Sequence, residues 1–212
     1  MKNTFSLTAG LLLSSCLVHA GVLVEAEGFV HRGGWVVDQQ FMDQMGSPFL
    51  MAHGLGRPVA DAVTSCEIPE AGTYRVLART RDWAAPWGRK EAPGRFQVLV
   101  NDTPLPQVLG TAGAEWGWHA AGRVTLEKGT ARLALRDLTG FNGRCDALIL
   151  TTDENFVPES EVARLEAFRR RIGTVRSAQS SETVDLIIAG GGIPGICMAI
   201  SAARLGLTVA LI

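Results

Sequence analysis

The sequence contains few residues of the types that mark metal centres, disulfide frameworks and nucleic-acid surfaces. It has four cysteines, four histidines and one tyrosine in 212 residues, with a net charge of −1. Cys66 and Cys145 match no disulfide or zinc spacing. They could pair in an oxidising compartment, but we expect two buried free thiols. His31, His53 and His119 show no metal-ligand spacing, and no hydrolase triad or carboxylate pair can be recognised. The balanced charge argues against nucleic acid as a partner.

The sequence also lacks an apolar run long enough to span a membrane. A short basic start precedes the mostly apolar run Phe5–Val18, and Val18-His19-Ala20 resembles a small-residue cleavage site. Residues 1–20 are therefore predicted to be a secretory signal peptide, which implies a secreted or periplasmic protein without a transmembrane segment. Leu13-Ser14-Ser15-Cys16 also resembles a bacterial lipobox, so the alternative is a lipoprotein anchored through Cys16.

Residues 21–150 show a period-two alternation of apolar and polar residues with frequent Gly and Pro. Short strands at this spacing indicate an all-β sandwich or jelly roll. Lys128-Gly129 is typical of a hairpin turn between the strands that flank it. The predicted strands are 22–27, 74–79, 96–100, 124–126, 131–135 and 147–150.

Residues 151–183 predict a helix followed by a linker. The helix places one apolar face toward the protein, made of Val162, Leu165, Phe168 and Ile172. The basic run Arg169–Arg171 lies in its last turn before Gly173, where positive charge suits the helix dipole. We expect this run to be a solvated helix end rather than a binding patch. Residues 177–182 are rich in serine and predict a linker into the last segment.

Residues 184–212 read as strand, glycine turn, helix and strand, the βαβ unit of a dinucleotide-binding domain. Gly190 allows the tight turn, Gly192 allows a pyrophosphate to approach the backbone, and Gly195 lets the helix pack close to the strand. The helix N-terminus offers free N–H groups to phosphates. The alternative is an ordinary βαβ turn with glycines for packing. The predicted cofactor-binding residues are Gly190, Gly191, Gly192, Ile193, Pro194 and Gly195.

The pattern Gly190-x-Gly192-x-x-Gly195-x-x-x-Ala199 resembles the N-terminal FAD-binding motif of FAD-dependent oxidoreductases. The resemblance covers residues 184–212 and implies a Rossmann-type domain with FAD as cofactor. In that family an acidic residue binds the ribose, and it would follow Ile212 directly. The flavin-ring contacts, the substrate domain and the redox residues would also lie beyond Ile212. We therefore expect the remainder of the flavin domain to be a partner of this unit, and these 212 residues alone to be inactive.

Three carboxylates of the β-domain are candidate metal ligands. Glu25 and Glu27 are two apart in the first predicted strand, so they share a face and need solvent, a basic partner or a cation. Asp146 could add a third carboxylate if the first and last strands are neighbours. Val24-Glu25-Ala26-Glu27 resembles the first strand of calcium-containing jelly-roll carbohydrate-binding modules, which implies a Ca²⁺ ion here. The alternative is exposed acids or an arginine salt bridge.

The chain has five tryptophans, and Trp83 and Trp87 lie in a predicted loop with Arg81 and Asp82. Indole faces stack on sugars, and neighbouring charged groups bond sugar hydroxyls, so these four residues are candidate substrate ligands. The same loop could instead dock against the flavin domain, and any single tryptophan could simply pack in the core.

Two interpretations of the whole sequence remain open. The first is the N-terminal part of an exported FAD-dependent oxidoreductase, in which a β-sandwich precedes a truncated Rossmann-type domain and the substrate is related to carbohydrate. The alternative is a secreted carbohydrate-binding or interaction module without catalysis.

Overall fold

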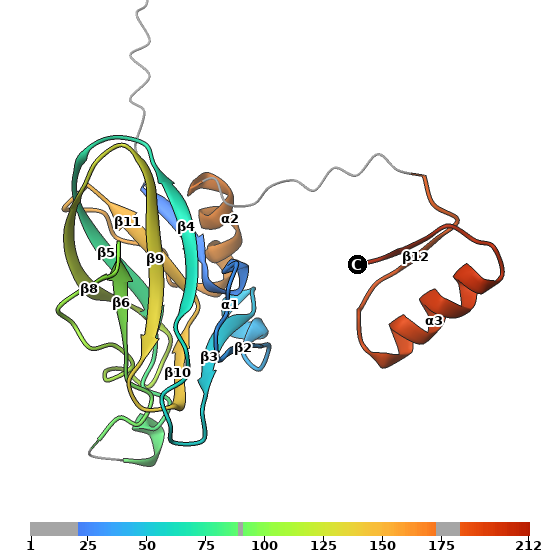
Figure 1. Ribbon diagram of the computed structural model, residues 1–212, viewed down its shortest axis with the longest axis horizontal. Coiled ribbons are helices and arrows are strands. Elements are labelled where there is room, and N and C mark those ends of the chain that lie inside the picture. Colours follow the sequence, from blue (N-terminus) through green and yellow to red (C-terminus); the bar gives the residue numbers. More distant parts are fainter. Residues whose placement is uncertain (1–20, 89–90, 173–182) are drawn as a thin grey trace, which may run out of the picture. The chain divides into compact units, whose positions relative to one another are not determined.

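The strands of the β-domain form antiparallel sheets in the computed structural model, which describes residues 21–88, 91–172 and 183–212 (Figure 1). The chain divides into two compact units, residues 1–175 and 176–212. The predicted signal peptide, including Cys16, and the predicted linker at 177–182 lie outside the described residues. No helix in the described part of the chain is both long and apolar enough to cross a membrane.

The first unit is a sandwich of two four-stranded sheets with a smaller third sheet. One sheet has the order β1 (Val22–Glu25), β11 (Ala147–Thr151), β5 (Gly72–Thr80) and β8 (Gly117–Leu126). The other has the order β4 (Ala62–Ile68), β9 (Gly129–Asp137), β6 (Phe96–Val100) and β7 (Thr103–Pro104). The third joins β10 (Phe141–Cys145), β3 (Phe49–His53) and β2 (Trp35–Asp38). The unit also contains the short helices η1 (Ala26–Gly28), α1 (Met42–Met45) and η2 (Ala85–Trp87), and the longer helix α2 (Val162–Ile172) described below.

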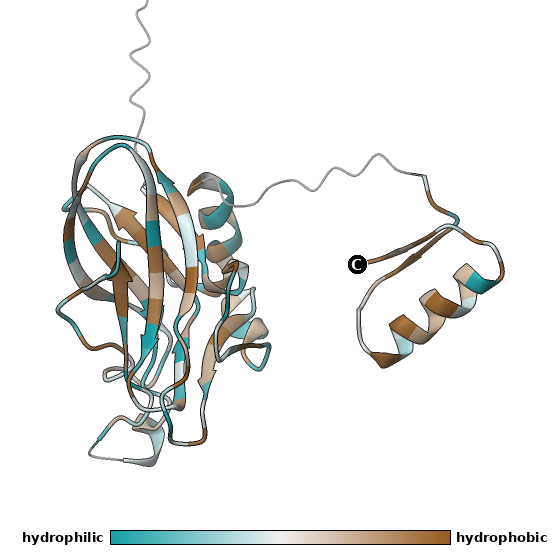
Figure 2. Ribbon diagram, viewed as in Figure 1, coloured by the Kyte–Doolittle hydropathy of each residue, from teal (hydrophilic) through white to brown (hydrophobic). Residues whose placement is uncertain are grey.

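The core lies between the two larger sheets because their strands alternate inward apolar and outward polar residues. On β5 the inward residues Tyr74, Val76 and Ala78 are buried, and Leu133 and Leu135 of β9 belong to the same cluster. Figure 2 shows this alternation as brown and teal segments along the strands. The predicted β-sandwich is confirmed.

The first and last strands of the sandwich are neighbours, as the calcium hypothesis required. β1 pairs antiparallel with β11, with Val22 opposite Leu150 and Glu25 opposite Ala147. The residue before β11 is Asp146, so this pairing brings Asp146 close to the end of β1. The main-chain N–H of Ala26 donates to the carbonyl oxygen of Asp146 at 2.9 Å.

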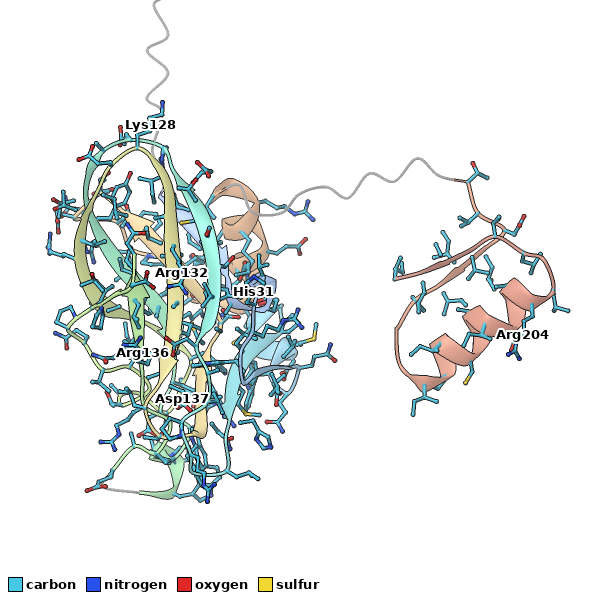
Figure 3. The ribbon with its side chains drawn as sticks, in the orientation of Figure 1. His31, Lys128, Arg132, Arg136, Asp137 and Arg204 are labelled. Carbon is cyan, nitrogen blue, oxygen red and sulfur yellow. The ribbon has the colours of Figure 1, made fainter. Side chains whose placement is uncertain are left out.

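The predicted hairpin at Lys128-Gly129 is wrong. Lys128 lies at the end of the sandwich (Figure 3), but β8 before it pairs with β5, and β9 after it pairs with β4 and β6. The turn therefore carries the chain from one sheet to the other. Turn residues specify a reversal of direction, and they do not specify which strand becomes the hydrogen-bonded partner.

The helix α2 (Val162–Ile172) covers the outer face of the β1-β11-β5-β8 sheet. Its Phe168 packs with Leu23, Leu77 and Ile149 of that sheet. Leu165 is also buried, as predicted, whereas Val162 at the first turn is 47% exposed. The helix and its apolar face are thus confirmed except at its first residue.

The second unit is a parallel βαβ unit, as the sequence predicts. β12 (Leu186–Ile188) pairs in parallel with β13 (Val209–Leu211), and α3 (Ile193–Arg204) connects them. Gly190 has a φ of 108°, which glycine adopts without strain. Much of the apolar surface of this unit is exposed, and Cys197 is exposed as well.

Candidate functional site

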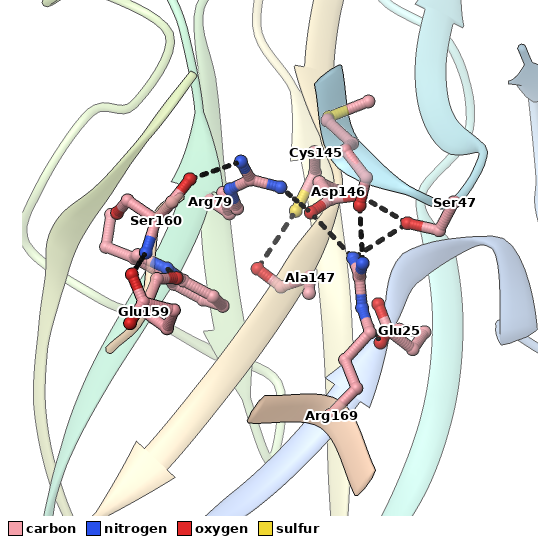
Figure 4. Close-up of polar contacts among 11 residues, drawn as sticks. Glu25, Ser47, Arg79, Cys145, Asp146, Ala147, Glu159, Ser160 and Arg169 are labelled. Atoms are coloured by element: carbon pink, nitrogen blue, oxygen red, sulfur yellow. Dashed lines mark hydrogen bonds and ion pairs between the residues drawn. The ribbon is translucent and has the colours of Figure 1, made fainter. Parts of the chain in front are cut away.

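Asp146 is the centre of a buried polar cluster beneath α2. Its side chain is fully buried and accepts hydrogen bonds from Arg79 Nη1 at 3.0 Å, Ser47 Oγ at 3.0 Å and Arg169 Nη2 at 3.3 Å (Figure 4). Arg79 is two residues from Leu77 in β5, so both side chains point to the outer face that α2 covers. The negative charge of the carboxylate and the positive charges of the guanidinium groups therefore compensate each other in a region that excludes water.

Arg169 bonds three segments of the sandwich from the buried side of α2. Its Nε donates to Glu25 Oε1 at 2.6 Å. Its Nη2 donates to Ser47 Oγ at 2.7 Å and also to Asp146, and its Nη1 donates to the main-chain oxygen of Met45. We call Glu25, Arg79, Asp146 and Arg169 the buried ion cluster.

The predicted solvated helix end is wrong for Arg169 and agrees with the structure for Arg170. The side chain of Arg169 is buried, whereas Arg170 is exposed and pairs with Glu166 one turn before it. The reason is helical geometry, because Arg169 follows Leu165 by four residues and precedes Ile172 by three. Those spacings place it on the buried face of the helix.

Glu27 lies beside this cluster but outside the predicted strand, because β1 ends at Glu25 and the chain continues as η1. Its Oε2 is buried and makes no hydrogen bond to the described residues, and the same is true of Glu25 Oε2. Burial raises the pKa of Glu27 to about 8, and the negative charge of Glu25 adds to the rise.

The three predicted calcium ligands come together, but they do not fit a calcium ion. Glu25 and Asp146 give oxygen atoms to the guanidinium of Arg169, which lies between them where a cation would have to bind. Among the described residues, no group of three or more His, Cys, Asp or Glu side chains could hold a metal ion. The arrangement matches the alternative drawn from the sequence, an arginine salt bridge.

The loop after β5 and the strand β10 bring three aromatic rings together, those of Trp83, Trp87 and Phe141. The indole of Trp83 stacks on Phe141 with ring centroids 5.8 Å apart and an interplanar angle of 16°. Its Nε1 donates to the main-chain oxygen of Phe141 at 3.1 Å. Trp87 meets Trp83 edge-on at 5.8 Å and is 70% exposed. The stacked rings of Trp83 and Phe141 thus support the indole of Trp87, which is exposed to solvent.

Two arginines that form no ion pair in the described part of the chain adjoin these rings. The guanidinium carbon of Arg144 lies 5.6 Å from the Trp83 ring centroid, and Arg81 and Arg144 lie 5.1 and 5.5 Å from that of Phe41. Both arginine residues are only 9% exposed, and neither guanidinium forms an ion pair or hydrogen bond with the described residues. Burial lowers the pKa of Arg144, the charge of Arg81 lowers it further, and the negative charge of Asp38 opposes the shift. We call Arg81, Trp83, Trp87, Phe141 and Arg144 the aromatic–arginine cluster.

The structure thus brings Arg81, Trp83 and Trp87 together, as the sequence analysis proposed. Asp82 differs, because its Oδ1 accepts the main-chain N–H of Ala84 at 2.9 Å and fixes the loop. Phe141 and Arg144 of β10 also lie at this loop and were not among the predicted site residues. The only signal in the sequence is that an aromatic and a basic residue flank Asn142-Gly143 just before the last strand.

The other tryptophans and cysteines of the sandwich pack within it or stabilise its loops. Trp116 packs edge-on against Phe49 at 5.0 Å, and Trp118 Nε1 donates to the main-chain oxygen of Glu159 at 2.9 Å. Cys66 is partly buried, Cys145 is fully buried, and both are free, as expected.

The glycine loop of the second unit begins at Gly190 and ends in the first turn of α3. A Cβ atom on Gly195 would lie 1.9 Å from the carbonyl oxygen of Gly190, so only glycine allows this approach of helix to strand. Gly192 is the N-cap of α3 and Pro194 lies in its first turn. A pocket of about 420 Å³ borders this loop, from Ile187 of β12 to Met198 of α3. Gly191, Gly192 and Ile193 are exposed, so the loop backbone is open to a ligand.

Comparison with protein-family models and with curated proteins found no match for the chain. Among solved structures, a family 35 carbohydrate-binding module from Clostridium thermocellum matches with a TM-score of 0.50 and 14% identity, over 62% of this chain and 98% of the module. The GH26-CBM35 β-1,4-mannanase of Podospora anserina matches with a TM-score of 0.50 and 17% identity, over 91% of this chain and 42% of the mannanase. At these identities the likeness concerns the fold. The first unit therefore has the jelly-roll-like fold of a family 35 carbohydrate-binding module.

Proposed function

We propose that the sandwich binds carbohydrate at the aromatic–arginine cluster. The observation that carries the proposal is the exposed indole of Trp87, held in place by Trp83, which itself stacks on Phe141. A large exposed ring on a fixed support is suited to stacking against the apolar face of a sugar. Its binding requires little loss of side-chain entropy.

Arg81 and Arg144 suggest the chemistry of the preferred sugar. A buried guanidinium is costly without an acceptor, and two neighbouring guanidinium groups raise that cost. A carboxylate on the ligand would accept charge-assisted hydrogen bonds from this pair, which are stronger than bonds to neutral hydroxyls. We therefore propose that the site prefers saccharides that carry a negative charge.

Replacing Trp87 with alanine should lower the affinity for saccharide by about tenfold, which corresponds to about 1.4 kcal/mol. Stability should change little because the side chain is exposed. The measurement is isothermal titration of the 212-residue chain with acidic and neutral oligosaccharides. Val30→Ala is the matched control, because Val30 is equally exposed at 72% and lies outside the cluster. Equal affinities of the two variants would contradict the proposed site, and so would a wild-type chain that binds none of the saccharides.

We also propose that the βαβ unit holds the pyrophosphate of FAD at residues 190–195, as the N-terminal part of an exported FAD-dependent oxidoreductase. The close approach of Gly195 to Gly190 supports this, because it brings the open N-terminus of α3 beside the end of β12. The flavin supplies hydride transfer when bound, and the residues of this chain would hold and orient its phosphates. The exposed apolar side chains of Ile187, Ile193 and Met198 are suited to packing against further parts of a flavin domain.

A further inference from the structure

The buried ion cluster contains as many cationic as anionic groups. Glu25 and Asp146 supply two carboxylates, and Arg79 and Arg169 supply two guanidinium groups. Each carboxylate is bonded to at least one guanidinium, and Asp146 is bonded to both. The charges of the cluster are thus balanced by the protein's own side chains.

The atoms that Arg169 bonds are of the kind that a hard cation takes. They are two carboxylate oxygens, one hydroxyl oxygen and one main-chain carbonyl oxygen, which come from Glu25, Asp146, Ser47 and Met45. Calcium prefers such a set of oxygen ligands. The guanidinium therefore fills a position among oxygen atoms that a divalent cation could otherwise use.

We propose that Arg169 replaces a structural calcium ion in this sandwich and fixes α2 to the sheet without a metal. Its planar fork bonds β1, the 45–47 segment and Asp146 at once, and no other side chain described for α2 bonds all three. A module that depends on a bound metal would lose stability when the metal is removed by a chelator. Here the cation is the guanidinium of an arginine side chain, so a chelator cannot remove it. The proposal rests on the fold and is independent of saccharide and flavin binding.

Thermal unfolding of the 212-residue chain tests the proposal. The wild type should have the same Tm in excess EDTA and in millimolar CaCl₂. Arg169→Ala in EDTA should lower the Tm by about 10 °C, because it leaves buried carboxylates without their partner. Arg170→Ala is the matched control on the same helix, with an exposed ion pair to Glu166, and its Tm should stay close to the wild type. Calcium should restore several degrees to Arg169→Ala alone, because the freed oxygens are calcium ligands.

A second pair of variants decides the matter if Arg169→Ala fails to fold. Glu25→Gln breaks the ion pair with Arg169 and should lower the Tm, while Glu27→Gln changes a carboxyl that makes no hydrogen bond through Oε2 and should not. A calcium site built on the two glutamates would make both variants less stable. A wild-type Tm that falls in EDTA would overturn the proposal, and so would equal Tm values for Arg169→Ala and Arg170→Ala. It would also be overturned if calcium did not raise the Tm of Arg169→Ala. For the glutamate variants, the contradicting result is an equal loss of Tm in Glu25→Gln and Glu27→Gln.

Discussion

Replacing Asp146 with alanine should lower the free energy of unfolding of the sandwich by about 3–5 kcal/mol, the largest effect that we expect from a single substitution in this unit. Asp146 is fully buried and is the acceptor shared by Arg79 and Arg169. Its removal leaves two buried guanidinium groups with an excess of positive charge. Urea unfolding followed by tryptophan fluorescence measures the loss.

Asp61→Ala is the control for this prediction. Asp61 also pairs with an arginine, Arg136, at 3.2 Å, but the pair is partly exposed at the surface. Surface ion pairs contribute about 0–1 kcal/mol. If the two aspartate variants lost the same stability, Asp146 would not be the centre of the cluster that holds α2 on the sheet.

Replacing Gly195 with alanine should remove most of the flavin from the protein made from its complete gene. The added Cβ would lie 1.9 Å from the carbonyl oxygen of Gly190, so the helix would have to move away from the strand. That movement displaces the N-terminus of α3 from the phosphates. The ratio of flavin to protein absorbance after purification measures the effect.

Ala203→Ser is suited as the matched control, because it adds one atom to an exposed position of the same helix. This variant should retain its flavin. A protein that never contains flavin, or a Gly195→Ala variant that binds it as the wild type does, would contradict the proposed cofactor site. Carbohydrate binding by the sandwich would remain unaffected by either outcome.

The parts of the fold that depend on neighbouring residues could be predicted from the sequence. The alternation along β5 and β6, the apolar face of α2 and the glycine turn before α3 are all short-range patterns, and the structure contains each of them. The partner of β8 could not be predicted, because the turn at Lys128 has the same sequence whether or not the chain changes sheets.

The composition of the buried ion cluster shows a second limit. Arg169 bonds Glu25 and Met45, which are 144 and 124 residues away in the sequence. Within a run of three arginines it resembles a solvated helix end. Its spacing from Leu165 and Ile172 indicated the buried face, and that signal was present in the sequence. What the sequence could not provide was the oxygen-lined position that receives the guanidinium.

Only those residues of the aromatic–arginine cluster that lie in the loop after β5 could be predicted from the sequence. Arg81, Trp83 and Trp87 are adjacent in one loop, so their common location follows from the sequence. Phe141 and Arg144 come from β10, which is joined to that loop by the hydrogen bonds of Thr80 to the main-chain oxygen of Arg144 and of Trp83 to that of Phe141. The same contacts explain why Trp83 is fixed while Trp87 is free.

The most direct test of the proposed function uses the five tryptophans as reporters. Each indole N–H gives a separate NMR signal, and their positions differ. Trp83 and Trp87 lie in the cluster, Trp35 is buried in the core, and Trp118 bonds Glu159 beneath α2. Trp116 is not a reference signal, because its ring contacts Phe41, which Arg81 and Arg144 face. Titration of the 212-residue chain with an acidic oligosaccharide should shift the signals of Trp83 and Trp87 and leave those of Trp35 and Trp118 in place. A titration that shifts Trp118 or Trp35 while Trp87 stays unchanged, or that shifts none of the five, would contradict carbohydrate binding at this cluster.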